Sequence, residues 1–150
     1  MKYLFPLLIV AFTMSACAKH KAKKQAEEDE ELIQNYINAH GLNATATGSG
    51  LYYVVDVQGT GEGCNSISDV TVAYTGSFTD GIVFEQSDPA GVTFNLQQVI
   101  QGWTEGIPKF NEGGSGKLLI PSALGYGAQS TPTIPANSVL IFDIELIDVL

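Results

Sequence analysis

Aromatic side chains are the residues of this chain whose types and positions suggest chemistry. Several of them stand in loops rich in glycine and proline, or on a predicted short helix, where a closed core would not need them. Packing in the core is the default interpretation for such residues, but together they could also line an apolar pocket that excludes water. The set consists of Tyr74, Phe78, Phe84, Phe94, Trp103, Phe110, Tyr126 and Phe142.

The groups that enzymes commonly use for acid–base, nucleophilic or metal chemistry are missing from this stretch. Both histidines precede residue 41, so neither a Ser-His-Asp nor a Cys-His mechanism would have a base inside the domain. Asp80, Glu85 and Asp88 form no recognisable set of metal ligands and are typical of solvated loops and turns. The sequence therefore predicts neither a metal nor another cofactor.

One reaction needs no acid, base or metal, namely rotation about the peptide bond that precedes a proline. Its barrier of about 18–20 kcal/mol arises because amide resonance is lost as the bond twists. The twisted amide has less charge separation than the planar amide, so an apolar pocket favours the twisted form. A backbone N–H or a phenol near the substrate carbonyls would hold the substrate in a turn. An aromatic pocket with one or two such donors is sufficient for this chemistry.

The charge distribution excludes one large class of partners. The chain has no arginine, 7 lysines and 16 acidic residues, and its formal net charge is −9. Five of the lysines lie within the first 24 residues, so residues 25–150 carry only Lys109 and Lys117 against all 16 acidic residues, a formal charge of −14. Such a body cannot neutralise a run of phosphates, which excludes nucleic acid as a partner.

Residues 1–16 have the features of an export signal. Lys2 is followed by an apolar run, ending in small residues, that is too short to span the roughly 30 Å hydrocarbon core of a membrane. The segment Met14-Ser-Ala-Cys17 is similar to a bacterial lipobox, in which the signal peptide is removed and the cysteine is lipidated. The alternative is an ordinary signal peptide with an incidental cysteine. We expect an exported lipoprotein of the bacterial cell envelope, anchored through Cys17. The sequence does not distinguish between the inner and the outer membrane.

Residues 17–46 are expected to connect this anchor to the domain. The lysine-rich part up to Ala26 has no apolar periodicity and is typical of a tether beside anionic lipid head groups. A stripe of apolar residues then predicts an acidic amphipathic helix over about residues 27–39, with Gly41 at its C-terminal end. This helix would pack on the domain or on a second copy of the chain, giving a homodimer, or would be a solvated spacer.

Residues 47–150 alternate strand-like runs with turn signals. The runs are rich in β-branched and aromatic residues, and Asp80-Gly81 between two of them predicts a hairpin. Apolar residues at helical spacing over residues 98–107 predict one short helix, which Pro108 would end. The expected fold is an α+β domain with a twisted antiparallel sheet of about five strands, wrapped on one short helix and preceded by a short N-terminal helix.

Eight short motifs follow one another along residues 50–150. They are Val72-Ala-Tyr74-Thr-Gly76, Asp80-Gly81-Ile-Val-Phe84-Glu85-Gln-Ser87, Phe94-Asn-Leu96, Val99-Ile100-Gln-Gly102-Trp103-Thr-Glu-Gly106, Glu112-Gly113-Gly-Ser-Gly-Lys117, Ile120-Pro121, Tyr126-Gly127 and Ile134-Pro135-Ala-Asn-Ser-Val-Leu-Ile-Phe142-Asp143-Ile-Glu145-Leu146. In this order and with this spacing, they resemble the FKBP-type peptidyl-prolyl isomerases. The resemblance is strongest to the secreted bacterial lipoprotein branch that includes the macrophage infectivity potentiators.

The resemblance implies a role for each matching residue. Trp103 would form the floor of a pocket for the proline ring. The backbone N–H of Ile100 and the hydroxyl of Tyr126 would donate hydrogen bonds to substrate carbonyls, and Ile134 would overhang the pocket from a mobile loop. The walls of the pocket would come from Tyr74, Phe84, Phe94, Val99 and Phe142.

Three positions depart from the pattern of the family. Glu85 stands where the family usually has aspartate, so its carboxylate is displaced by one methylene and its hydrogen bonds to neighbouring side chains are altered. Thr131 replaces an aromatic residue or histidine found in some members, and Pro108 ends the short helix earlier than usual.

The function expected from these observations is peptidyl-prolyl cis-trans isomerisation in exported, incompletely folded proteins, without a cofactor. Proline isomerisation takes tens of seconds unaided and can limit folding, which gives such an enzyme a purpose. The alternative is a non-catalytic module that binds proline-containing segments in the same pocket, and Glu85 keeps that alternative open. The resemblance also implies macrolide inhibitors as ligands of the pocket.

Overall fold

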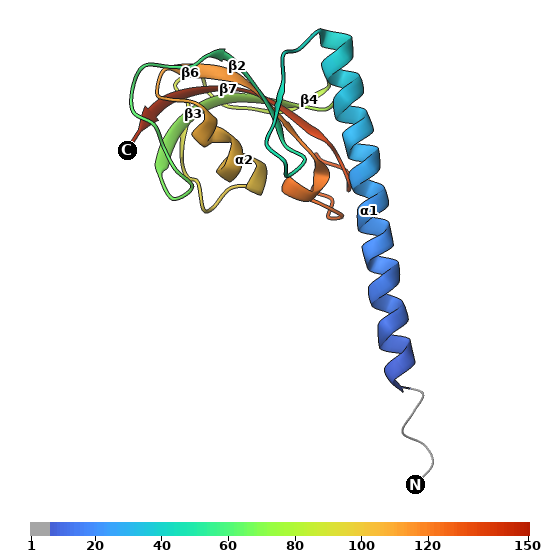
Figure 1. Cartoon of the computed structure of the whole chain (residues 1–150). Helices are drawn as coiled ribbons and strands as arrows, with labels where there is room; N and C mark the ends of the chain where they lie inside the picture. The colour runs from blue at the N-terminus through green and yellow to red at the C-terminus, as the bar shows by residue number, and fades with distance from the viewer. Residues whose placement is uncertain (1–6) are drawn as a thin grey trace.

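The computed structural model describes the backbone of residues 7–150 and the side chains of residues 17–150, so the first six residues of the predicted signal peptide lie outside the described residues. A long helix, α1 (Leu7–His40), packs beside a curved antiparallel sheet and projects beyond it toward the N-terminus (Figure 1). A short helix, α2 (Gln101–Gly106), lies below the sheet in the same view. This arrangement is the expected α+β fold.

Helix α1 is longer than the sequence pattern predicts. The stretch Ala18–Ala26, expected to be a lysine-rich tether, is helical and continuous with the helix predicted over residues 27–39. The predicted start of the helix is therefore corrected, because alanine, lysine and glutamine all have high helix propensity even without an apolar stripe. The ion pair of Lys23 with Glu27, at 3.7 Å, adds local support. Across the described residues, none of the helices has the length and apolar character needed to cross a membrane.

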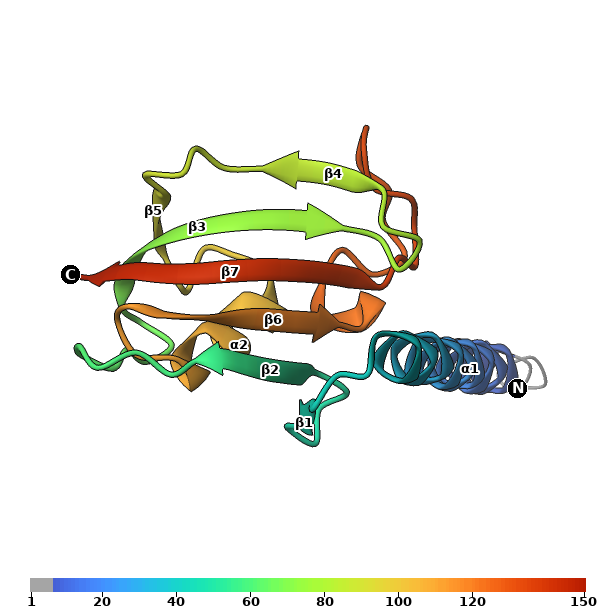
Figure 2. The same ribbon diagram turned by 90° about the horizontal axis from the view of Figure 1, so that it is seen from above.

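The sheet contains seven antiparallel strands in the order β1-β2-β6-β7-β3-β4, and β5 also pairs with β3. Figure 2 shows β4, β3, β7, β6 and β2 side by side in this order. The two strands beyond the predicted five are β1, which has only two residues, and β5, which has four. The bounds are β1 (Thr45–Ala46), β2 (Tyr52–Val57), β3 (Asp69–Ser77), β4 (Val83–Gln86), β5 (Val92–Asn95), β6 (Gly114–Ile120) and β7 (Leu140–Val149).

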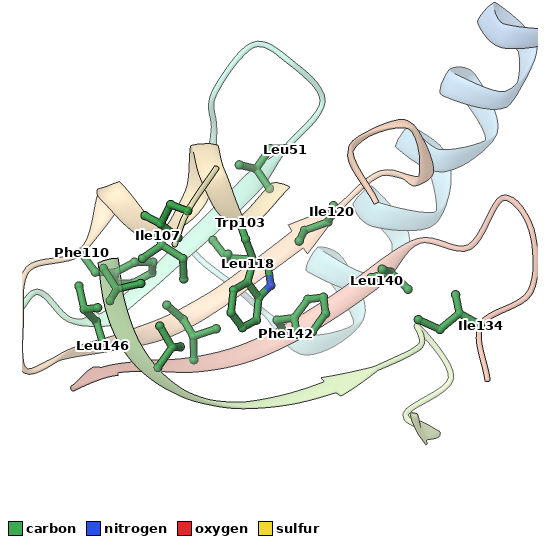
Figure 3. Packing of buried hydrophobic residues seen from close by; sticks show 14 residues of the cluster. Leu51, Trp103, Ile107, Phe110, Leu118, Ile120, Ile134, Leu140, Phe142 and Leu146 are labelled. Atoms are coloured by element: carbon green, nitrogen blue, oxygen red, sulfur yellow. The ribbon is translucent and has the colours of Figure 1, made fainter. Parts of the chain in front are cut away.

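The main core lies between the sheet and α2, where Trp103 is only 4% exposed (Figure 3). Gly102 and Gly106 of α2 face β6. A Cβ atom at these two positions would lie 2.5 Å from Ile120 and 2.6 Å from Leu118, so a larger residue would push the helix away from the strand. The two glycines therefore allow the close approach that seats the Trp103 indole on the sheet.

The chain continues beyond α2 into a 3₁₀ helix, η1 (Ile107–Lys109), which contains Pro108 in its first positions. Proline is tolerated there because the first residues of a helix have no intrahelical N–H bond to lose. The single helix predicted over residues 98–107 is therefore corrected to two consecutive short helices that begin at Gln101.

A second apolar cluster occupies the opposite face of the sheet and receives α1. Leu119 and Ile141 belong to this cluster, whereas their neighbours Leu118 and Phe142 belong to the main core, as the alternation of side chains along a strand requires. Ile33 of α1 is fully buried in the second cluster. The C-terminal part of α1 is therefore packed on the domain and is not a solvated spacer.

Ile33→Ala should lower the free energy of unfolding by about 2–4 kcal/mol, because it removes a fully buried side chain from the contact between helix and sheet. Leu32→Ala is the matched control, since Leu32 precedes it on the same turn and is 44% exposed. Its effect should stay below about 1 kcal/mol. Urea denaturation followed by circular dichroism measures both changes, and equal losses would contradict the described docking of α1.

Candidate active site

A pocket of about 410 Å³ opens between α2 and the sheet. Strands β3, β4, β5 and β7, the N-terminal end of α2 and the loop after β6 all contribute to it. The lining residues are Tyr74, Glu85, Phe94, Gln98, Val99, Ile100, Trp103, Tyr126 and Phe142. The pocket therefore combines residues that lie up to 68 positions apart, between Tyr74 and Phe142, into one mainly aromatic surface.

Trp103 forms the floor of this pocket and is held by three other rings. The indole meets Tyr74 at 4.9 Å, Phe94 at 5.5 Å and Phe142 at 5.3 Å between ring centroids, with interplanar angles of 86°, 85° and 82°. Edge-to-face contacts of this kind are the favoured geometry for aromatic pairs. The floor is therefore apolar and fixed in orientation before any ligand binds.

The indole N–H of Trp103 is buried and has no hydrogen-bond partner within the described residues. Leaving a buried donor unpaired costs roughly 1–3 kcal/mol. A phenylalanine would avoid this penalty, but its smaller ring would leave a cavity in the core. The wide, flat face of the indole is the feature that a phenylalanine could not supply to the pocket.

A polar pair stands on the wall above this floor. The Tyr74 hydroxyl donates a hydrogen bond to Glu85 Oε1 at 3.0 Å. Desolvation, followed by the hydrogen bond to Glu85, raises the pKa of Tyr74 to about 12. Glu85 therefore makes the side-chain contact that its extra methylene had placed in question, and it keeps the Tyr74 phenol protonated and oriented.

Two of the residues that line the pocket carry a hydrogen-bond donor that has no acceptor within the described residues. Ile100 precedes α2, and its carbonyl accepts the Trp103 and Thr104 N–H groups, but its own N–H makes no bond within residues 17–150. The hydroxyl of Tyr126 is likewise unpaired in this part of the chain, and the residue is 39% exposed. Desolvation, with the nearby charge of Glu85, raises the pKa of Tyr126, which keeps this hydroxyl a donor.

Two of the residues implied by the resemblance lie away from the pocket surface. Phe84 packs behind it, with its ring at 5.6 Å from Phe142 in an edge-to-face contact. Ile134 is 4% exposed and belongs to the main core. Its backbone is tied to Thr131, whose N–H bonds the Ile134 carbonyl at 2.8 Å while the Thr131 hydroxyl accepts the Ile134 N–H at 2.9 Å. Ile134 is therefore a buried core residue that is not among the residues lining the pocket.

One lining residue was missed by the sequence analysis. Gln98 lies on the pocket beside Val99, and as a polar residue it does not stand out from an apolar or aromatic pattern. Within the described residues, no group of three or more histidine, cysteine, aspartate or glutamate side chains is placed to hold a metal ion. The arrangement can desolvate an apolar ring on Trp103 and offer two N–H or O–H donors to adjacent carbonyl groups.

The fold is similar to that of solved structures. The chain is similar to a peptidyl-prolyl cis-trans isomerase from Pseudomonas syringae pv. tomato str. DC3000, with a TM-score of 0.74, 29% sequence identity and coverage of 85% of this chain and 94% of that chain. It is also similar to FkpA from Escherichia coli, with a TM-score of 0.73, 35% identity and coverage of 95% of this chain and 69% of that chain. The fold and the aromatic pocket thus define an isomerase-type domain.

The family model for FKBP-type peptidyl-prolyl cis-trans isomerases matches residues 62–147, and the chain belongs to this family. Curated relatives described as FKBP-type peptidyl-prolyl cis-trans isomerase FkpA are 43% identical over 133 residues in Aeromonas hydrophila and 38% identical over 142 residues in Escherichia coli (strain K12). These matches cover 86% and 91% of this chain but 50% and 52% of the relatives. The chain therefore spans about half the length of the curated relatives it matches.

Tyr74 should titrate near pH 12 in the folded chain, well above the value of 10.0 for an unperturbed tyrosine. Because the folded-state pKa is the higher one, the stabilisation linked to this phenol is complete below pH 10 and is lost as the pH rises from 10 to 12. The difference in phenolate absorbance between the chain and its Tyr74→Phe variant measures this titration. Glu85→Gln should lower the Tyr74 pKa only partly, because desolvation is the larger cause.

A Tyr74 phenol that titrates like an exposed tyrosine would contradict the described pocket wall. Tyr53→Phe is the control for nonspecific effects of removing one tyrosine, since Tyr53 is half-buried on β2 and does not line the pocket. The Tyr53→Phe variant should leave the titration of Tyr74 as it is in the parent chain.

Proposed function

We propose that this chain catalyses cis-trans isomerisation of the peptide bond before proline in exported, incompletely folded polypeptides. The observation that carries the proposal is the pocket itself. Trp103 gives it an apolar floor, and two of its lining residues carry unpaired donors, the N–H of Ile100 and the hydroxyl of Tyr126. Membership of the FKBP-type isomerase family supports it.

The pocket acts on the barrier through differential binding. A proline ring that binds on the face of Trp103 would be removed from water. The peptide bond that precedes the ring would be desolvated together with it. The twisted amide has less charge separation than the planar cis or trans form, so it loses less hydration in this apolar setting. The Ile100 N–H and the Tyr126 hydroxyl would hold the flanking carbonyls and so keep the chain in a turn while the bond rotates.

Glu85 contributes to this mechanism through Tyr74. Its carboxylate holds the Tyr74 hydroxyl at 3.0 Å, so that ring stays edge-on to the Trp103 indole at 4.9 Å. A glutamate in place of aspartate therefore still braces the wall of the pocket. With this contact present, Glu85 gives no reason to prefer the non-catalytic alternative, in which the same pocket would only hold proline-containing segments.

Tyr126→Phe should reduce kcat/KM for a proline peptide by roughly two- to tenfold, the effect of one hydrogen bond worth about 0.5–1.5 kcal/mol. Tyr53→Phe is the matched control, because it removes a tyrosine hydroxyl outside the pocket and should leave kcat/KM unchanged. A protease-coupled assay, in which only the trans peptide is cleaved, measures the rates.

The same assay separates the two candidate functions. Turnover no faster than in buffer, with peptide binding retained, would reject the enzyme and leave the binding module. Glu85→Asp, run beside the parent chain, shows whether the longer carboxylate limits the rate. A Tyr126→Phe variant as active as the parent would show that the Tyr126 hydroxyl is not needed for turnover. It would not contradict the role proposed for Trp103.

We also propose that the chain is an exported lipoprotein, anchored to the bacterial envelope through Cys17 after removal of residues 1–16. The lipobox-like segment supports this proposal, as does the exposed position of Cys17 on α1. The 12 helical steps from Cys17 to Asp29, where the helix is bonded to the domain, span about 18 Å at a rise of 1.5 Å per residue. The helix would therefore hold the domain away from the membrane.

Cys17→Ser should abolish incorporation of labelled fatty acid and release the chain from the membrane fraction. Cys64→Ser is the matched control, because Cys64 is half-buried in the domain and burial raises the pKa of its thiol. Fractionation of cells expressing each variant measures the outcome. A Cys17→Ser variant that stays lipidated would show that the cysteine is incidental.

We propose the N-terminal helix α1 as the surface for a second copy of the chain. We also propose the pocket as a site for macrolide inhibitors. A groove of about 600 Å³ runs between α1 and the loop after β6, and alanines at positions 18, 22, 26, 123 and 128 give it an apolar lining. Sedimentation of the full chain tests for the homodimer, and competition with peptide turnover tests for the inhibitor.

A further inference from the structure

A buried carboxylate on α1 lies outside the pocket and has no part in the mechanism above. Asp29 is 1% exposed, and its side chain accepts three hydrogen bonds. The backbone N–H and the hydroxyl of Ser122 bond Oδ2 at 2.8 and 2.6 Å, and Gln25 Nε2 bonds Oδ1 at 2.8 Å. Ser122 is itself 2% exposed, so both partners of this contact are buried. A buried charge is tolerated only when it is bonded in this way.

Ser122 in turn organises the segment that carries the Tyr126 hydroxyl. It begins the 3₁₀ helix η2 (Ser122–Leu124) directly after β6. Its carbonyl accepts two hydrogen bonds, from the N–H of Gly125 at 3.0 Å and from the N–H of Gly127 at 2.8 Å. These two residues flank Tyr126 in the chain. The backbone on both sides of the pocket tyrosine is therefore tied to the residue that Asp29 holds.

The docking of α1 does not depend on Asp29 alone. Ile33 packs into the second apolar cluster, and the Tyr52 hydroxyl donates a hydrogen bond to Glu30 Oε1 at 2.7 Å. Both contacts attach α1 to the sheet and neither touches the loop after β6. The Asp29 bonds differ from them because two of the three converge on one residue of that loop, 93 positions further along the chain.

We propose that Asp29 is a positioning residue for the pocket, which sets the placement of the Tyr126 hydroxyl through Ser122. Helix α1 thereby takes part in substrate recognition without contacting the substrate. This inference rests on the proposed isomerase function for its kinetic consequence, whereas its structural part, the control of the segment around Tyr126, stands independently. The path runs through four described residues: Asp29, Ser122 and the two glycines 125 and 127.

Kinetics of the full chain test the coupling in a double-mutant cycle. Asp29→Ala should reduce kcat/KM by about fivefold, within the range seen for residues that act through a neighbour. In the Tyr126→Phe background the same substitution should cost less than about twofold, because the hydroxyl it positions is gone. Tyr52→Phe is the matched control: it breaks the other hydrogen bond of α1 to the domain and should leave kcat/KM unchanged in both backgrounds.

Equal losses from Asp29→Ala in the two backgrounds would overturn the proposal, since a general destabilisation acts regardless of Tyr126. So would a Tyr52→Phe effect as large as that of Asp29→Ala. Ser122→Ala removes only the hydroxyl bond at 2.6 Å and keeps the backbone one, so it should reproduce the loss at a smaller size. That milder variant keeps the test open if Asp29→Ala fails to fold.

Amide hydrogen exchange provides a readout that does not require turnover. The Gly125 and Gly127 amides should exchange at least about tenfold faster in Asp29→Ala or Ser122→Ala than in the parent, and at the parental rate in Tyr52→Phe. Unchanged exchange at both glycines in these variants would overturn the positioning role. If the parent chain showed no turnover while the exchange changed as expected, the proposed function would fail and the positioning role would remain.

Discussion

The seating of the Trp103 indole between α2 and the sheet is the interaction on which the rest of the structure depends. Rings from β3, β5 and β7 meet it edge to face at 4.9–5.5 Å, and each such pair contributes roughly 0.5–1.5 kcal/mol beyond the area it buries. Gly102 and Gly106 allow the approach of the helix, as a Cβ atom at either would press on β6. The core and the pocket therefore share two residues, Trp103 and Phe142, which stabilise the fold and also line the pocket.

The two faces of the sheet contact different parts of the molecule. One face carries the main core and the pocket, and the other receives α1 around Ile33. The segment from Ser122 to Tyr126 is where these two parts meet, because Asp29 reaches it from α1 while Tyr126 faces the pocket. Helix α1, which the sequence suggests is only a connector, thus contacts the segment that carries Tyr126 of the candidate site.

Much of the fold could be predicted because its signals are local. Strand-like runs, the Asp80-Gly81 turn and the short helix before Pro108 all appear in the sequence, whereas β1, with two residues, is too short to leave a pattern. The full length of α1 was not predicted, because the prediction relied on an apolar stripe, whereas residues of high helix propensity can form a helix without one. Positions such as Ile134 and the contact of Asp29 with Ser122 depend on tertiary contacts between distant segments, which no local pattern encodes.

Trp103 is the only tryptophan of the chain, so its fluorescence reports on the floor of the pocket alone. The most direct test of the account is a titration with a proline-containing peptide in which Trp103 fluorescence and the rate of cis-trans exchange are followed in the same sample. The account predicts that both signals change together and reach half-saturation at the same peptide concentration. A fluorescence change that saturates while exchange stays at the rate in buffer, or exchange that accelerates with no change at Trp103, would contradict it.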